Sequence, residues 1–205
     1  DGVCVDWRYL HEREKSALQQ ESGWLKRQGV RIVVDLSPGI NLYPTLRLID
    51  NLHSEYQASM AVANDVLAKM EIFGARDLLL PLHRHPETNF TDEQTRAAFT
   101  ETLKTLAPQA AVRGVTLHLR VGFGKPPWNL DEALQWLDRI GAPNLKLAVC
   151  PALLEHKSPS DKIATHLKGS LGLWLVAASR SDAAGKLWDA HAPIHSAPNL
   201  DWLSR

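Results

Sequence analysis

Short apolar runs alternate with amphipathic helical stretches along most of this chain, and this alternation limits the fold more than any other feature. The apolar runs are rich in β-branched residues and leucine, and most are nearly continuous rather than alternating with polar residues. Continuous runs of this length are typical of parallel strands that are buried on both faces. We expect strands at Val3–Trp7, Val30–Leu36, Asp77–Leu82, Val115–Val121, Leu145–Cys150, Leu171–Ala177 and Ala192–Ser196.

Helical patterns fill the intervals between these runs. Thr91 and Gln94 form a capping-box signature that opens one helix, and Arg113-Gly114 is a typical end for it. Strand and helix in regular succession predict right-handed βαβ units. The other helices are expected at Glu12–Gln28, Glu55–Phe73, Ala133–Ile140 and Ala183–Ala190.

The length of the chain narrows the architecture further. A complete (β/α)₈ barrel takes about 250 residues, whereas this chain has 205. The predicted fold class is therefore α/β, a TIM-type barrel that is incomplete with about seven strands; a compact complete barrel and an open doubly wound sheet remain alternatives. We expect one domain over residues 1–205, and the start at Asp1 suggests a domain taken from a longer protein.

Composition excludes some partners. The formal net charge is +0, which does not favour a nucleic-acid surface, and no apolar run has the length of a membrane span. Cys4 and Cys150 both lie in apolar runs, so we expect small buried thiols rather than a disulfide. Further domains of the parent chain are expected as partners.

Three segments carry a family resemblance: Ala61–Leu82, Leu103–Leu119 and Asp131–Val149. Each resembles a helix–strand unit of the xylose isomerase-like TIM barrels, and the likeness extends over about Glu12–Ala190. That family includes sugar isomerases and epimerases, inosose dehydratases and nucleases of the endonuclease IV type. The resemblance implies a barrel fold, a site at the carboxyl ends of the strands and a small sugar or sugar acid as the partner.

The resemblance also implies a divalent metal held by carboxylates and histidine, but these ligands do not carry over. The family's metal-binding Glu would fall on Arg120, its Asp on Cys150 and its His on Leu153. A guanidinium about 4 Å from a cation costs roughly 1–4 kcal/mol in repulsion. We therefore expect no cofactor; a divalent metal is expected only in the alternative of an active enzyme, with Asp35 and two histidines as ligands.

The residues that follow the predicted strands, or lie on loops above them, form the candidate site. Histidines there would transfer protons, arginines would bind a carboxylate, and tryptophan would stack on a sugar ring. A simple polar rim, with Asp35 paired to Arg84 or Arg120, is the structural alternative. The candidate catalytic residues are His83, His85 and His195, and the candidate substrate-binding residues are Asp35, Tyr43, Arg84, Arg120, Trp128 and Arg180.

These features support two main functions. The first is a degenerate, non-metal sugar isomerase-like barrel that binds carbohydrate or has a structural role in a larger protein. The second is an active isomerase, epimerase or dehydratase that uses the rim histidines and arginines; a nuclease of the endonuclease IV type fits less well. Trp24 and Trp136 are expected to pack in the core, and His118 is expected to have no chemical role.

Overall fold

The computed structural model describes most of the first three quarters of the chain and short segments after it. The described ranges are 2–36, 46–50, 53–80, 88–120, 130–149, 167, 169–174, 178–181 and 187–192. Side chains are described up to residue 173 within these ranges. The following account concerns these residues.

Six parallel strands form one sheet in the order β1-β2-β3-β4-β5-β6, and each strand pairs with its successor in the sequence. This regular order is the arrangement that successive right-handed βαβ units produce. The strands are β1 (Gly2–Asp6), β2 (Arg31–Asp35), β3 (Asp77–Leu80), β4 (Thr116–Arg120), β5 (Leu145–Val149) and β6 (Leu171–Trp174).

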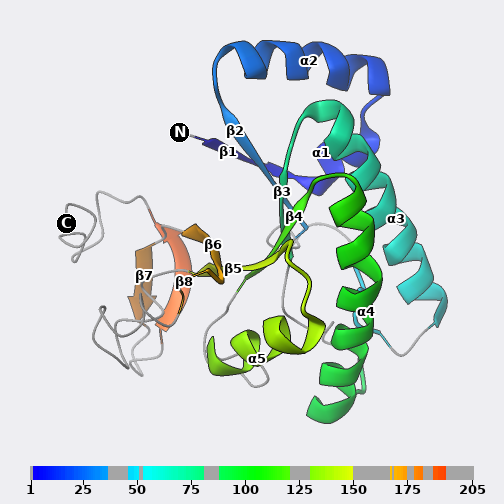
Figure 1. Ribbon diagram of the computed structural model, residues 1–205, viewed down its shortest axis with the longest axis vertical. Helices are drawn as coiled ribbons and strands as arrows, with labels where there is room; N and C mark the ends of the chain where they lie inside the picture. Colours follow the sequence, from blue (N-terminus) through cyan, green and yellow to red (C-terminus); the bar gives the residue numbers. More distant parts are fainter. Residues whose placement is uncertain are drawn as a thin grey trace.

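Five helices connect these strands and lie along one side of the sheet (Figure 1). They are α1 (Trp7–Glu12), α2 (Lys15–Arg27), α3 (His53–Phe73), α4 (Asp92–Val112) and α5 (Leu130–Ile140). The expected capping box opens α4: the Gln94 amide donates to Thr91 Oγ1 over 3.2 Å, and the Thr91 amide donates to Gln94 Oε1 over 2.9 Å. None of the helices in the described ranges has the length and apolar character needed to span a membrane.

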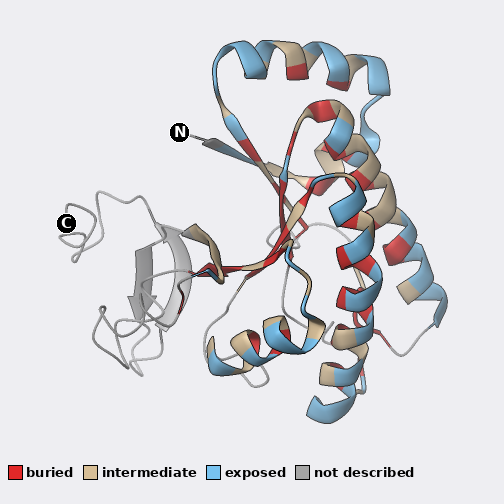
Figure 2. Ribbon diagram, viewed as in Figure 1, coloured by how far each residue is buried: buried red, intermediate tan, exposed pale blue. Residues whose placement is uncertain are grey.

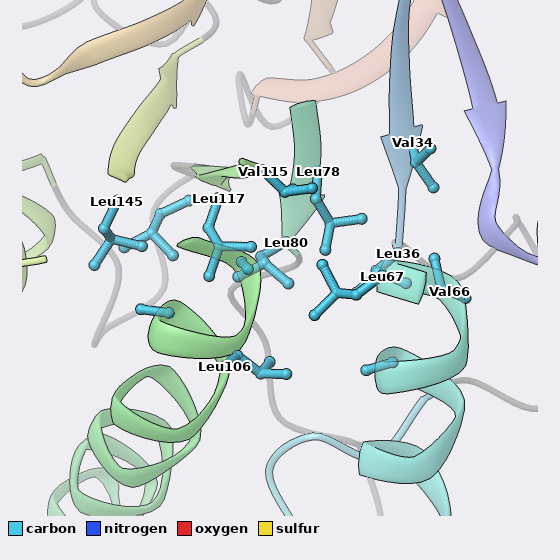
Figure 3. Close-up of a cluster of buried hydrophobic side chains, with 14 of the residues drawn as sticks. Val34, Leu36, Val66, Leu67, Leu78, Leu80, Leu106, Val115, Leu117 and Leu145 are labelled. Carbon is cyan, nitrogen blue, oxygen red and sulfur yellow. The ribbon is translucent and has the colours of Figure 1, made fainter. Parts of the chain in front are cut away.

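The main hydrophobic core lies between the sheet and these helices. Val34, Leu78, Leu80, Leu117 and Leu145 point from the strands toward Val66, Leu67 and Leu106 of α3 and α4 (Figure 3). All of these side chains are at most 2 % exposed. Red, buried positions accordingly follow the strands and the inward sides of α3 and α4 in Figure 2. The predicted α/β fold with a parallel sheet is therefore confirmed.

The last part of the chain differs from the expectation. Ala178–Ser181 (β7) and Leu187–Ala192 (β8) form a separate antiparallel pair, on the opposite side of the sheet from α3 and α4 (Figure 1). The helix predicted at Ala183–Ala190 is therefore wrong over its second half. Pairing with β7 determines the conformation of Leu187–Ala192, although the composition of this segment favours a helix.

Candidate functional site at the carboxyl ends of the strands

The sheet has a second face, opposite the helices, and this face is unexpectedly polar. Because side chains alternate along a strand, the residues between the core positions of each strand point to this second face. We call this set the inner face; it comprises Cys4, Asp6, Arg31, Val33, Asp35, Asp77, Leu79, Thr116, His118, Arg120, Lys146, Ala148 and Gly172. In a TIM-type barrel this face surrounds the barrel axis.

At the amino ends of the strands, three inner-face residues form one network. Arg31 donates two hydrogen bonds to Asp77, Nε to Oδ2 over 2.8 Å and Nη2 to Oδ1 over 2.9 Å. His118 Nε2 lies 2.7 Å from Asp77 Oδ1. His118 is 1 % exposed, while the Arg31 side chain is 58 % exposed. We call these three residues the lower network.

The lower network keeps a buried carboxylate ionised. Burial on its own would raise the pKa of Asp77, but the hydrogen bonds from His118 and Arg31 outweigh burial and lower this pKa to about 2. An ionised Asp77 accepts hydrogen bonds only, so His118 Nε2 carries the donated proton. The other ring nitrogen, Nδ1, is buried and has no hydrogen-bond partner.

Gly172 in β6 makes room for the His118 ring. A Cβ on Gly172 would lie 2.8 Å from Lys146 Cβ and would come still closer to Nδ1 and Cε1 of His118. The ring cannot move away easily, because its Nε2 is bound to Asp77. Gly172 is therefore required by close packing and not by its backbone angles. Apart from the unpartnered His118 Nδ1, the lower network is tightly packed and internally hydrogen-bonded, which are the features of a stabilising element.

At the carboxyl ends, the inner face carries Asp35 at the end of β2 and Arg120 at the end of β4. Both of them, together with Asp6, act electrostatically on the Cys4 thiol in β1, so their charges lie within electrostatic range of Cys4. Desolvation raises the pKa of Cys4, the Asp35 charge raises it further, and Arg120 acts in the opposite direction. The thiol is therefore protonated at neutral pH. We call Cys4, Asp35 and Arg120 the upper cluster.

Cys4 is exposed, so the expectation of a buried thiol is wrong for this residue. The apolar run around it predicts burial, but Cys4 lies on the inner face of β1, a strand that pairs with β2 alone among the described strands. Within β1, Val5 is the residue that packs against the helix-side core. Cys150 lies outside the described residues.

Asp6, the last residue of β1, is also the N-cap of α1. Its Oδ1 accepts from the Arg8 amide over 2.9 Å and from Arg8 Nε over 2.8 Å. The Arg8 guanidinium lowers the pKa of Asp6. This carboxylate is thus used locally, in joining β1 to α1.

The upper cluster does not suit a hard divalent cation. Such a cation needs several oxygen ligands, whereas this cluster offers the Asp35 carboxylate, a protonated thiol and a guanidinium with a permanent positive charge; the Asp6 carboxylate, which also acts on Cys4, is bonded to Arg8. Within the described ranges, no three His, Cys, Asp or Glu side chains are grouped so that they could bind a metal ion. A neutral donor-and-acceptor site fits these residues better.

The structure tests little of the predicted site. It places Asp35 and Arg120 together on the inner face, as the sequence suggests. Arg180 lies in β7, and its side chain is not described. The remaining candidates fall outside the described residues, and their roles stay predictions: His83, His85, His195, Tyr43, Arg84 and Trp128.

Sequence reasoning missed the lower network. His118 is expected to have no chemical role, and the structure gives it a structural one in a hydrogen-bonded triad with Asp77 and Arg31. One signal was present: Thr116, His118 and Arg120 stand two residues apart, which places three polar side chains on one face of β4. Trp136 is 1 % exposed, as expected, but Trp24 is 56 % exposed and does not pack in the core.

Solved structures with this fold include several epimerases. D-psicose 3-epimerase, determined in the presence of D-fructose, matches with a TM-score of 0.72 and 18 % identity over 91 % of this chain and 66 % of its own. D-psicose 3-epimerase from Clostridium cellulolyticum H10 with D-tagatose gives a TM-score of 0.74 and 13 % identity over 87 % of this chain and 63 % of its own. The 3-keto-D-glucoside 4-epimerase from E. coli gives a TM-score of 0.67 and 15 % identity over 86 % and 68 %.

This chain thus spans about two thirds of the length of these proteins. No curated protein matches the sequence. At these identities the structural matches establish the fold. The family model described as xylose isomerase-like TIM barrel matches residues 2–204. The chain therefore belongs to the xylose isomerase-like TIM barrel family.

Proposed function

We propose that this chain is a sugar-binding barrel domain that holds its ligand at the upper cluster without the metal typical of its family. The observation that supports this proposal is the position of Arg120 and Asp35 on the inner face, at the carboxyl ends of β4 and β2. TIM barrels bind their ligands at this end. The family and its fold relatives make a sugar or sugar acid the first ligand class to consider.

The chemistry of the upper cluster suits a sugar. The Arg120 guanidinium donates hydrogen bonds only, and the oxygens of the Asp35 side chain offer acceptors, whereas a sugar hydroxyl does both. One ring can therefore satisfy both residues through neighbouring hydroxyls. A positive charge at Arg120 would repel a divalent cation at this end, by roughly 1–4 kcal/mol at about 4 Å. The binding role thus fits the described residues better than metal-assisted isomerisation.

Isothermal titration of the full chain with D-fructose and D-tagatose, before and after exhaustive chelation, tests this proposal. We expect binding that chelation leaves unchanged and that Arg120→Ala weakens about tenfold or more. Arg139→Ala is the matched control, because Arg139 is an exposed arginine of α5. It should bind as the unmodified chain does.

Two outcomes would contradict the proposal. One is binding that chelation abolishes and that one equivalent of Mg²⁺, Mn²⁺ or Zn²⁺ restores. The other is epimerisation or isomerisation of the sugar that is lost in His83→Ala or His85→Ala, which would favour the active-enzyme alternative. NMR analysis of the recovered sugar detects such turnover directly.

A further inference from the structure

A cavity of about 530 Å³ lies away from the inner face, between α2 and the α1 and α3 helices. Its base is apolar: Phe73 at the end of α3 is buried, and Tyr9 and Leu25 are half-buried. Its volume falls within the range of small-molecule sites, roughly 300–1,000 Å³. The proposed sugar site at the barrel mouth does not use any of these residues, and the two sites are independent. We call this cavity the α2 pocket.

The wall of the α2 pocket is formed by one side of α2. Gln20, Trp24 and Arg27 stand four and three residues apart, and Glu21 lies beside them, so their side chains share this side of the helix. Gln20 and Arg27 are exposed, and Glu21 is half-buried. Four polar or aromatic side chains thus surround an apolar base, which is the usual composition of a small-molecule site.

Trp24 is the unusual member of this wall. It is 56 % exposed, and the only other large hydrophobic side chains exposed in the described ranges are Val3 and Val112. An indole is amphipathic, with a flat apolar face and one N–H donor. The exposed part of the Trp24 indole remains in water, so it adds no hydrophobic stabilisation to the fold. Placed beside polar groups in a cavity, it provides a platform for the apolar C–H face of a sugar ring.

Glu21 is held in position before any ligand arrives. The Tyr9 hydroxyl donates to Glu21 Oε2 over 2.6 Å, and this bond raises the pKa of Tyr9. The Arg13 guanidinium lies 4.8 Å from the centre of the Tyr9 ring and so covers the tyrosine from the other side. Since only Oε2 is occupied in this way, Oε1 is available as an acceptor. A carboxylate that is already held in place loses less side-chain conformational entropy when a ligand binds to it.

The charges in the pocket wall indicate the class of ligand. Glu21 contributes one negative charge and Arg27 one positive charge, so the wall as a whole is neutral. Among the described residues, Arg27 has no hydrogen-bonding or ion-pair partner, and its donors are available. A carboxylate ligand would meet Glu21, and an ammonium ligand would meet Arg27. Hydroxyl groups satisfy both, because each hydroxyl can donate and accept.

We propose that the α2 pocket binds a neutral pyranose, with the ring stacked on Trp24 and its hydroxyls bonded to Glu21, Arg27 and Gln20. The site would be a second carbohydrate-binding site on the outside of the barrel. The proposal rests on the exposed indole, the fixed carboxylate and the balanced charge, and it stands whether or not the barrel mouth binds a sugar.

NMR of the full chain with methyl β-D-glucopyranoside tests this assignment. The indole N–H signal of Trp24 is assigned by its loss in Trp24→Ala. We expect a saturable shift of this signal with a dissociation constant on the order of 1 mM. Measured by backbone amide shifts, because the indole signal is absent from both variants, Trp24→Ala should weaken binding about tenfold, and Trp24→Tyr should retain most of it because the stacking surface survives. Tyr9→Phe should weaken binding severalfold by releasing Glu21.

A matched control and a change of ligand make the result decisive. Val112→Ala shortens another exposed hydrophobic side chain, on α4, and should leave the affinity unchanged. The neutral glycoside should bind equally at low and high salt.

The absence of any saturable shift of the Trp24 signal would overturn the proposal. So would preferential binding of methyl β-D-glucopyranosiduronate that high salt abolishes, because Arg27 would then bind an anion. Loss of D-fructose binding in Arg120→Ala, with the Trp24 response retained, separates this site from the barrel mouth.

Discussion

The two ends of the inner face use the same kinds of residue for different purposes. At the amino ends of the strands, Arg31, Asp77 and His118 bind one another, and Asp77 and His118 are nearly inaccessible to water. At the carboxyl ends, Asp35 and Arg120 lie near an exposed Cys4, in a set that combines donors and acceptors. The charges at the amino ends thus stabilise the fold, while those at the carboxyl ends stand where TIM barrels generally bind their ligands.

The largest effect is expected at Gly172. Gly172→Ala places a methyl group against the His118 ring and Lys146 Cβ, so the lower network must distort. We expect the free energy of unfolding to fall by about 3 kcal/mol, measured by urea denaturation. Gly23→Ala is the matched control, since only Arg27 Nη1 lies within 4 Å of the added Cβ, at 3.7 Å. A similar result for both variants would show that the lower network is loosely packed.

Removing the charge of Asp77 should have the next largest effect. Asp77→Asn leaves the buried His118 Nε2 and the Arg31 guanidinium without their anionic acceptor. We expect a loss of about 2–3 kcal/mol in the free energy of unfolding. Asp138→Asn, at an exposed aspartate of α5, should change it by less than about 0.5 kcal/mol. If Asp77→Asn were as stable as this control, the charged residues at the amino ends of the strands would not have the stabilising role that sets them apart from those at the carboxyl ends.

The pKa of Asp77 predicts how acid affects the lower network. This pKa is about 2 in the folded chain, below the usual value of 3.8. A carboxylate with a lowered pKa stabilises the fold above about pH 4, and this contribution is lost as the pH falls through about 2. The shift corresponds to about 2 kcal/mol. Urea midpoints at pH 5, 4, 3 and 2 should show this loss in the unmodified chain and a flatter profile in Asp77→Asn; parallel profiles would contradict it.

The smallest effect on stability is expected at the upper cluster. Arg120→Ala should change the free energy of unfolding by less than about 1 kcal/mol, because the side chain is only half-buried and lies at the end of a strand. The same variant should lose sugar binding at the mouth. Urea denaturation and titration of one protein sample measure both quantities. A loss of stability as large as that of Asp77→Asn would make Arg120 a structural residue.

Local signals in the sequence predicted much of the fold. The capping box at Thr91 and the apolar strand runs depend on neighbouring residues, and the structure confirms the helix and most of the strands that they indicate. The helix predicted at Ala183–Ala190 failed because strand pairing with β7 is a non-local interaction. Periodicity alone could not detect it.

The candidate site was harder to predict, for a related reason. Asp35 and Arg120 follow from the rule that barrels place ligands at strand ends, and the structure places both at the carboxyl ends of their strands, while their binding role stays a prediction. The roles of Asp77 and His118 depend on the register between β3 and β4, which a single sequence does not specify. Trp24 shows the converse: its helical spacing suggests packing, but no neighbouring element covers it among the described residues.

The Asp6 carboxylate makes the junction between β1 and α1 direct and rigid. Asp6 ends the strand and begins the helix, so no spare residue lies between them to absorb a change of angle. Swinging α1 outward would break the cap and the last β1–β2 pair together. Any adaptation of the barrel mouth to a ligand that moves α1 relative to β1 would therefore cost both of these interactions.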